Sequence, residues 1–202
     1  MAHHSTIRCL ALSLLSFLLL VGCHAQATPE QFQVLFLRQL DQAHSYQADF
    51  RLESAGRDLL VRQWYRAPGL LRTDVLEDNQ ATFRFIYDQT TLRVIHLASG
   101  QQQQVTLTAG NELFVSPLML DCCRQASQST WRPAGERAYV SDFTWTATDN
   151  QQKSGRLTVD AATLLPLELE LIWPDQELVR ITLQQMLLNP TLDEALFSET
   201  GR

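Results

Sequence analysis

The sequence contains a single lysine, Lys153, and the other 15 of its 16 basic residues are arginines. No basic cluster appears that could follow a phosphate backbone or a row of anionic headgroups. Against these stand 22 acidic residues, which give a net charge of −6. This balance argues against nucleic acid as a partner.

Cysteine is also scarce, with Cys9, Cys23 and the adjacent pair Cys122-Cys123. No disulfide framework can be built from them. A bond between neighbouring residues needs a strained ring, so the pair is predicted to be apolar helix residues or free thiols. The histidines that follow Cys23 are far apart in sequence and lack ligand spacing to the cysteines, which predicts no metal site. They are His24, His44 and His96.

Catalytic motifs are missing as well. There is no Gly-x-Ser-x-Gly elbow, no His-Glu-x-x-His helix and no glycine-rich phosphate loop. Carboxylates occur in pairs, as in Asp193-Glu194 and in Glu168 with Glu170, but solvated charges explain both. The second pair is expected on the outer face of a strand whose inner face is Leu167, Leu169 and Leu171. The prediction is that the chain is not an enzyme and uses no cofactor.

Only one long apolar run is present, from Cys9 to Val21, and it follows Arg8. It is too short to span a bilayer. Leu20-Val21-Gly22-Cys23 resembles the lipobox that bacterial lipoprotein signal peptidase cuts. The pattern therefore predicts a signal peptide over residues 1–22, lipid on Cys23, a lipidated tether over 23–27 and one domain over 28–202. The alternative is an ordinary secretory signal with an incidental Cys23.

The domain begins with a helix signal. Thr28 is suited to the N-cap, Pro29 to the first helical position, and Gln31 to the reciprocal bond of a capping box. An apolar stripe follows at helical spacing, and the helix is expected to end near His44. The stripe consists of Phe32, Leu35, Phe36 and Leu40.

Beyond this helix the hydrophobic period changes to two, which indicates strands with one apolar face. Short turns such as Ala67-Pro68-Gly69 join them, and such turns connect antiparallel neighbours into a meander. A short apolar helix is predicted to begin at Ser116-Pro117, and Gln101–Gln104 is expected to form a loop or a strand edge. The predicted strands are 46–52, 59–66, 70–76, 82–87, 91–97, 143–148, 155–159, 167–173 and 178–183.

Five stretches of the chain are similar to the LolA/LolB superfamily of lipoprotein carriers. They are Trp64–Arg72 (WYRAPGLLR), Tyr87–Leu92 (YDQTTL), Ser116–Leu120 (SPLML), Leu157–Asp160 with Leu165-Pro166, and Leu188–Pro190 with Leu196-Phe197. The resemblance spans Thr28 to about Phe197. It implies an α+β fold, in which an incomplete antiparallel β-barrel has helices covering its concave side.

A hydrophobic cavity for the acyl chains of lipoproteins is also implied by this resemblance. An acyl chain is flexible and featureless, so its binding needs apolar area and adaptable side chains. The periodicity alone leaves open whether the large residues of the concave face are packed core or surround a ligand. The residues expected to bind ligand are Phe50, Trp64, Leu71, Phe83, Phe85, Leu118 and Met119.

One departure from the family concerns the arginine that holds the lid shut in the soluble carrier. Ala67 occupies its position before the proline, and Arg66 stands one place earlier. Because successive strand residues face opposite sides, Arg66 is expected on the face opposite to that of the carrier's arginine, and the same parity gives Arg66 the face of Trp64. Gln89 also replaces the glycine usual in the following turn.

Lipidation makes the chain resemble the anchored acceptor of the superfamily more than its shuttling carrier. The expected function is to bind acyl chains of lipoproteins or lipids, in lipoprotein sorting or insertion. The alternative is a regulatory lipoprotein that keeps the fold and binds a protein partner, as in germination or stress-signalling lipoproteins. His24 after Cys23 predicts the outer membrane, facing the periplasm, in a host with two membranes. With one membrane, the outer face of that membrane is expected.

Overall fold

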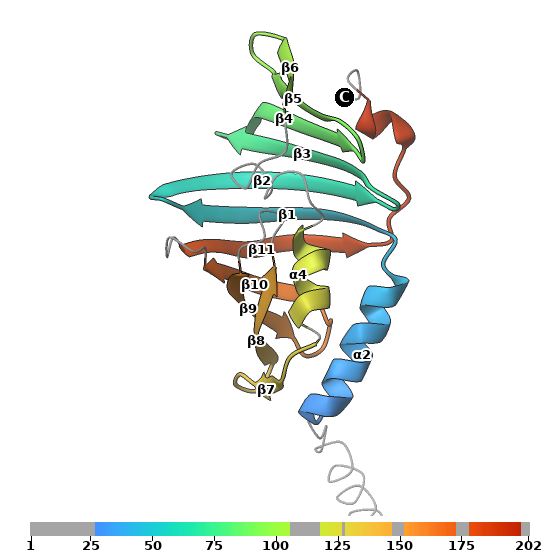
Figure 1. The fold of residues 1–202 in the computed structure, drawn as a ribbon, viewed down its shortest axis with the longest axis vertical. Coiled ribbons are helices and arrows are strands. Elements are labelled where there is room, and N and C mark those ends of the chain that lie inside the picture. Colours follow the sequence, from blue (N-terminus) through green and yellow to red (C-terminus); the bar gives the residue numbers. More distant parts are fainter. Residues whose placement is uncertain (1–26, 106–117, 127, 147–151, 173–177, 199–202) are drawn as a thin grey trace, which may run out of the picture.

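The computed structural model describes residues 27–105, 118–126, 128–146, 152–172 and 178–198. The expected signal peptide, Cys23 and the start of the tether lie outside these residues. Figure 1 shows one large twisted sheet with two helices in front of one face. Within the described residues, no helix is long and apolar enough to cross a bilayer, and no three His, Cys, Asp or Glu side chains gather as metal ligands would.

The first helix, α2 (Pro29–Gln42), begins where the sequence predicts. Thr28 accepts a hydrogen bond from the backbone N–H of Gln31, whose side chain accepts one from the backbone N–H of Thr28, so the capping box is complete. Phe32, Phe36 and Leu40 are buried, as expected. The prediction for Leu35 is wrong, because its side chain is exposed.

Among the described residues, eleven strands form one sheet, and every neighbouring pair is antiparallel. The strands of its first part are β1 (Ser45–Ser54), β2 (Arg57–Arg66), β3 (Leu70–Glu77), β4 (Gln80–Asp88), β5 (Leu92–His96) and β6 (Gln101–Val105). Those of its second part are β7 (Trp131–Pro133), β8 (Ala138–Thr146), β9 (Gln152–Asp160), β10 (Pro166–Ile172) and β11 (Leu178–Leu188). The remaining elements are α4 (Leu118–Ala126) and the 3-10 helix η1 (Glu194–Phe197).

The strand order is β6-β5-β4-β3-β2-β1-β11-β10-β9-β8-β7. The expectation of one continuous meander is therefore incomplete, since two meanders are joined by the pairing of β1 with β11. The two end strands, β6 and β7, are not paired with each other, so the described sheet is not closed into a barrel. An α+β fold with an open antiparallel sheet and helices on one face is the predicted fold class, and it is confirmed.

We call the face that packs against the helices the inner face. α4 packs against β8, β9 and β10, while α2 packs against β7 and α4. We refer to β1 and β7–β11 as the helix-covered half of the sheet, and to β3–β6 as the distal half. The core of the helix-covered half is aromatic: Phe32 stacks on Tyr139 with ring centroids 4.0 Å apart, and Phe36 meets Trp131 edge-on at 5.1 Å.

The helix α4 contributes both remaining cysteines to this core. Cys122 and Cys123 are buried thiols, which confirms the prediction of apolar helix residues or free thiols. Burial raises the pKa of the Cys123 thiol far above its ordinary value, so the thiolate is disfavoured. The residues expected to begin this helix, Ser116-Pro117, lie outside the described part of the chain.

Gln101–Val105 forms an edge strand, β6, with four exposed glutamines, which agrees with the expected loop or strand edge. Two other local features differ from the sequence-based expectations. The short strand β7 and the first residues of β8 lack a clear alternation and are not among the predicted strands. Leu167, expected to face inward with Leu169 and Leu171, is exposed, because a register shift between Pro166 and Glu168 breaks the alternation there.

Candidate functional site

Cross-strand register decides which side chains of the distal half face inward. Leu71 lies opposite Tyr65 and Tyr87, and Tyr65 lies opposite Tyr46, whose side chain belongs to the core. Directly paired residues share a face, so the residues of β4 and β5 that pair with inward residues of the preceding strand also face inward. Val75 on β3, Phe83 and Phe85 on β4, and Val94 and His96 on β5 are among the residues that face inward by this register. We call these five the distal inner patch.

The distal inner patch is more exposed on β4 and β5 than on β3. Val75 on β3 is buried, Phe85, Val94 and His96 are half-buried, and Phe83 is 38% exposed. The ring of Phe83 lies 5.0 Å from the imidazole of His96, and His96 Nδ1 is 2.7 Å from Ser99 Oγ. A large aromatic side chain is thus left accessible on the same face that is a packed core under the helices.

Two predicted ligand-binding residues are part of the buried core. Phe50 on β1 is 2% exposed and Leu71 on β3 is 1% exposed. Phe50 lies in the helix-covered half and has no accessible surface to offer a ligand. Leu71 lies beside the distal inner patch. Leu118 and Met119 were also expected to bind ligand. They are the first two residues of α4, and their side chains are not among those described.

The expectation that Trp64 shares this face is wrong. Trp64 is paired with Gln47 on one side and Arg72 on the other, and all three lie on the outer face. Its ring is 4.8 Å from the guanidinium carbon of Arg72, a cation–π contact. The reason is strand parity, which places Trp64 opposite in direction to the buried Gln63 and Tyr65.

The expected turning of Arg66 to the face of Trp64 is confirmed. Its guanidinium lies 5.5 Å from the ring centroid of Phe197 and 3.5 Å from the carboxylate of Glu194, both in η1. It also donates a hydrogen bond to the carbonyl of Leu192 at 3.4 Å. In this chain the arginine therefore holds the C-terminal segment against the outer face of the sheet.

A buried polar network separates the two halves on the inner face. The hydroxyl of Tyr46 donates to Gln63 Oε1, and Gln63 Nε2 donates to Thr73 Oγ1 at 2.9 Å. Burial raises the pKa of Tyr46 well above its ordinary value, so the phenol stays protonated and remains a donor. Buried polar groups with complete partners fix one arrangement of side chains. The network thus gives the boundary of the distal inner patch a defined structure.

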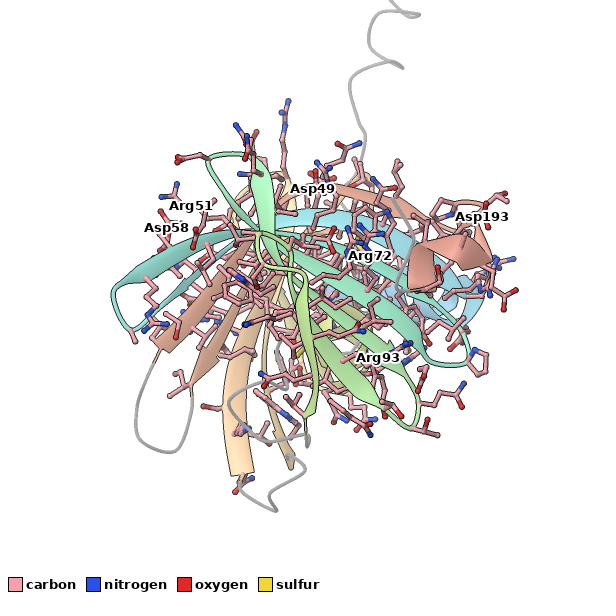
Figure 2. All side chains as sticks on the ribbon, turned by 90° about the horizontal axis from the view of Figure 1, so that it is seen from above. Asp49, Arg51, Asp58, Arg72, Arg93 and Asp193 are labelled. Atoms are coloured by element: carbon pink, nitrogen blue, oxygen red, sulfur yellow. The ribbon has the colours of Figure 1, made fainter. Side chains whose placement is uncertain are left out.

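Buried charges support the distal half from its outer face. Asp74 accepts two hydrogen bonds from Arg72, at 3.0 and 2.5 Å, and two from Arg84, at 3.0 and 3.2 Å. Arg72 also donates to the carbonyl of Leu196 at 3.3 Å, which joins this cluster to η1. Figure 2 places Asp193, at the start of η1, at one end of the sheet and the pair of Arg51 with Asp58 at the other.

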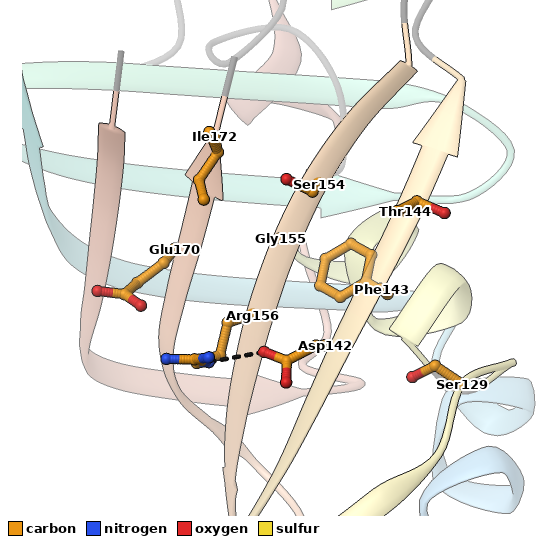
Figure 3. Close-up of a pocket in the computed structure, with 9 residues that line it drawn as sticks. All are labelled: Ser129, Asp142, Phe143, Thr144, Ser154, Gly155, Arg156, Glu170 and Ile172. Carbon is orange, nitrogen blue, oxygen red and sulfur yellow. Dashed lines mark hydrogen bonds and ion pairs between the residues drawn. The ribbon is translucent and has the colours of Figure 1, made fainter. Parts of the chain in front are cut away.

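The outer face of the helix-covered half is also charged, but it is solvated. A hollow of about 470 Å³ lies on this face. Figure 3 shows Arg156 between Glu170 and Asp142, which both line the hollow. Arg156 and Arg132 each approach Asp142 at 2.7 Å. Partial burial raises the pKa of Asp142, but the hydrogen bonds from these arginines outweigh it and lower the pKa below its ordinary value. Paired carboxylates and guanidiniums offer no nucleophile with an adjacent base here.

Sequence reasoning missed Val94 and His96 as members of the candidate site. Their strand was predicted, and the alternation of Leu92, Val94 and His96 with Arg93 and Ile95 gives the correct face. The missing information was the pairing of β5 with β4, which sets Val94 beside Phe85 and His96 beside Phe83. A pattern within one strand does not contain that register.

No family model matches the sequence, and no curated protein matches it. Several solved structures are similar to this chain. A chain of the complex of MucA and MucB from Pseudomonas aeruginosa has 20% identity and a TM-score of 0.45, over 82% of this chain and 60% of that chain. This chain therefore spans less than two thirds of the length of that protein.

Two further similar structures match over nearly their whole length. The lipoprotein LppX from Mycobacterium tuberculosis has 8% identity and a TM-score of 0.47, over 82% of this chain and 99% of that chain. A LolA superfamily protein from Nitrosomonas europaea has 10% identity and a TM-score of 0.43, over 83% of this chain and 97% of that chain.

Proposed function

We propose that this chain is a bacterial envelope lipoprotein, anchored through Cys23, that binds the acyl chains of lipoproteins or lipids at the distal inner patch. It acts in lipoprotein sorting or insertion. In a host with two membranes the anchor places it on the outer membrane, facing the periplasm. In a host with one membrane it lies on the outer face of that membrane.

The accessible ring of Phe83 is the observation that supports this proposal most. Phe83 is 38% exposed on a face whose equivalent residues in the helix-covered half are core. Large aromatic side chains contribute strongly to binding when they are removed from water. An occupant that covered Phe83 and the half-buried Phe85 and Val94 would therefore gain apolar contact without displacing α2 or α4.

The chemistry of the patch fits an acyl chain better than a polar ligand. The ring of His96 contacts Phe83 and Ser99. The other side chains of the distal inner patch have no polar atoms, so they present only hydrocarbon to an occupant. The arginines of β3 and β4 lie on the outer face, where they bind Asp74. A hydrophobic chain needs area and no directed hydrogen bonds, and the patch provides this.

Native mass spectrometry of the mature domain with Cys23→Ser tests the proposal. The protein is expressed in a bacterial envelope, purified without detergent, and then offered palmitate. We expect a co-purifying lipid mass or uptake of palmitate, and loss of both in Phe83→Asp. The matched control is Leu187→Asp, which introduces the same charge at an exposed apolar residue of β11 outside the patch.

A bare protein mass that takes up no palmitate would contradict acyl binding. Equal loss in Phe83→Asp and Leu187→Asp would instead contradict the location of the site. Both variants are first checked for an unchanged denaturation midpoint, so that unfolding is not mistaken for loss of ligand.

A second candidate function is an anchored module that binds a protein partner. The observation in its favour is the packed inner face of the helix-covered half, where Phe50 is 2% exposed and leaves no space for cargo. Affinity capture from detergent-solubilised membranes would then return one stoichiometric protein, and acyl uptake would be absent. If no such protein is captured from cells in any of several growth states, the result would count against this candidate.

A further inference from the structure

The outward side of α2 carries three exposed aliphatic residues that the core does not use. Val34 is 66% exposed, Leu35 is 47% exposed and Leu37 is 36% exposed. Single exposed apolar residues are common on protein surfaces, but these three share the side of α2 opposite to Phe32 and Phe36, with the exposed Arg38 among them. We call Val34, Leu35 and Leu37 the outer strip of α2.

The helix cannot rotate to bury this strip. Its opposite side is fixed in the core by Phe32, which stacks on Tyr139, and by Phe36, which contacts Trp131. The start of the helix is also fixed, since the hydroxyl of Tyr139 donates a hydrogen bond to the carbonyl of Ala27. Because the inward side is held at both aromatic contacts, the outer strip stays at the surface of the isolated protein.

The position of the strip in the sequence determines which surface it meets. Cys23, the proposed lipid attachment site, precedes the N-cap Thr28 by five residues. At about 3.3–3.6 Å per residue, a fully extended tether spans at most about 18 Å. Val34 follows Thr28 by six residues of helix, which adds about 9 Å at 1.5 Å per residue. An anchored chain thus keeps the outer strip within about 27 Å of the bilayer surface, as both lengths require.

We propose that the outer strip of α2 lies against the phospholipid surface that holds the anchor. This inference depends on the proposed anchoring through Cys23 and adds the orientation of the domain. Val34, Leu35 and Leu37 would enter the interface between headgroups and acyl chains, as the apolar side of an interfacial helix does. Arg38, exposed on the same side, would extend its guanidinium to the phosphates.

The docked orientation has a consequence for the proposed function. α2 packs against β7 and α4, at the end of the sheet opposite to β6. Figure 1 shows α2 beside the helix-covered half, away from β4 and β5. With α2 on the membrane, the distal inner patch is held away from the bilayer, where it can meet cargo that arrives from the aqueous side.

An artificial anchor tests the docking independently of native lipidation. The mature chain with Cys23→Ser carries a hexahistidine tag before residue 23 and is bound to phosphatidylcholine vesicles that contain a nickel-chelating lipid. Val34→Cys is labelled with the environment-sensitive fluorophore NBD, and Gln102→Cys on the exposed strand β6 is the matched control. Cys122 and Cys123 are buried, so the folded protein is labelled at the introduced cysteine.

We expect the emission of the label at residue 34 to shift to shorter wavelength on the vesicles and to be quenched by lipids brominated on the acyl chain. The label at residue 102 should show neither effect. In a chain that also carries Leu35→Asn and Leu37→Asn, the tether is unchanged but the shift should be lost. A shift that persists in this variant, or its absence in the parent, would overturn the proposal.

Two controls separate this result from the proposed function. Palmitate uptake should be unchanged by Leu35→Asn with Leu37→Asn, and the emission shift should be unchanged by Phe83→Asp. Failure of palmitate uptake alone would contradict acyl binding and leave the docking supported. Failure of the emission shift alone would contradict the docking and leave acyl binding supported.

Discussion

The two halves of the sheet are covered from opposite sides. In the helix-covered half, α2 and α4 fill the inner face, and the outer face is a solvated array of ion pairs such as Arg156 with Asp142. In the distal half, η1 and the cluster of Arg72, Asp74 and Arg84 lie on the outer face, and Phe83 is accessible on the inner face. The distal half therefore keeps its structure without using its inner face fully.

This difference shows how one antiparallel sheet can combine a stable core with an accessible apolar surface. Helices that covered the whole inner face would bury Phe83 and leave nothing for a ligand. Without η1 and the buried charges, the strands of the distal half would lack a packed layer on either side. Substitutions in the two halves should therefore lower the free energy of unfolding by different amounts.

Phe36→Ala is expected to lower the free energy of unfolding by about 3–5 kcal/mol, because it removes a buried ring from the aromatic core. The matched change in the distal half is Phe83→Ala, expected to lower it by about 1 kcal/mol or less, because this ring is already partly in water. Urea denaturation of both variants measures the difference. Equal losses would mean that the distal inner patch is ordinary core.

Asp74→Asn is expected to lower the free energy of unfolding by about 3 kcal/mol, since it leaves two arginines of a buried cluster without their carboxylate. Arg72 is 3% exposed, so water cannot replace the lost partner. Asp58→Asn is the control and should change the free energy of unfolding little, because its pair with Arg51 is half-exposed and water screens it. A small effect of Asp74→Asn would show that η1 alone supports the distal half.

Gly155→Ala tests how completely the inner face of the helix-covered half is filled. A Cβ at this position would lie 2.7 Å from Phe143 Cζ and 3.0 Å from the carbonyl oxygen of Glu170. Such overpacking is expected to lower the free energy of unfolding by about 1–3 kcal/mol. Ser154→Ala, one residue away on the outer face, should change little. A neutral Gly155→Ala would reveal space in this half, and thermal denaturation gives the answer.

The smallest effect concerns acid stability of the two halves. The pKa of Asp160 in the helix-covered half is lowered chiefly by the backbone N–H of Thr163, and that of Asp88 in the distal half chiefly by the hydroxyl of Thr90. A lowered folded-state pKa gives stability that is present above the unfolded value of about 3.9 and is lost as the pH falls through the folded value.

Asn at either position keeps a hydrogen-bond acceptor but cannot titrate. Asp160→Asn and Asp88→Asn should therefore each reduce the fall of the urea midpoint as the pH is lowered from about 4 toward the folded-state pKa. Both turns are near the surface, so the change is expected to be small. A midpoint that falls as steeply as in the unaltered chain would exclude these carboxylates as its cause.

Local sequence patterns predicted much of the fold because they reflect interactions within a single helix or strand. The capping box of Thr28 and Gln31 and the alternation of β1 follow from backbone geometry, and both are found in the structure. Alternation also placed Phe50, Leu71, Phe83 and Phe85 on one face, as their register confirms. Trp64 was predicted on the wrong face because its large side chain favoured the core. It lies two residues from Arg66 in the same strand, and this spacing gives both residues one face.

The remaining features depend on contacts between distant segments. The pairing of β1 with β11 and the exposure of Leu35 depend on which element packs where, and no pattern within a helix or strand contains that information. The same limit applies to the candidate site. Phe50 and Phe83 have the same alternation, yet Phe50 belongs to the buried core and Phe83 is accessible.

Hydrogen–deuterium exchange of the mature domain, with and without saturating palmitate, tests most directly whether the distal half holds the acyl chain. The account predicts slower exchange confined to β3, β4 and β5, with β8, β9 and β10 unchanged. Slower exchange in β8–β10, or no change anywhere while palmitate is bound, would contradict it.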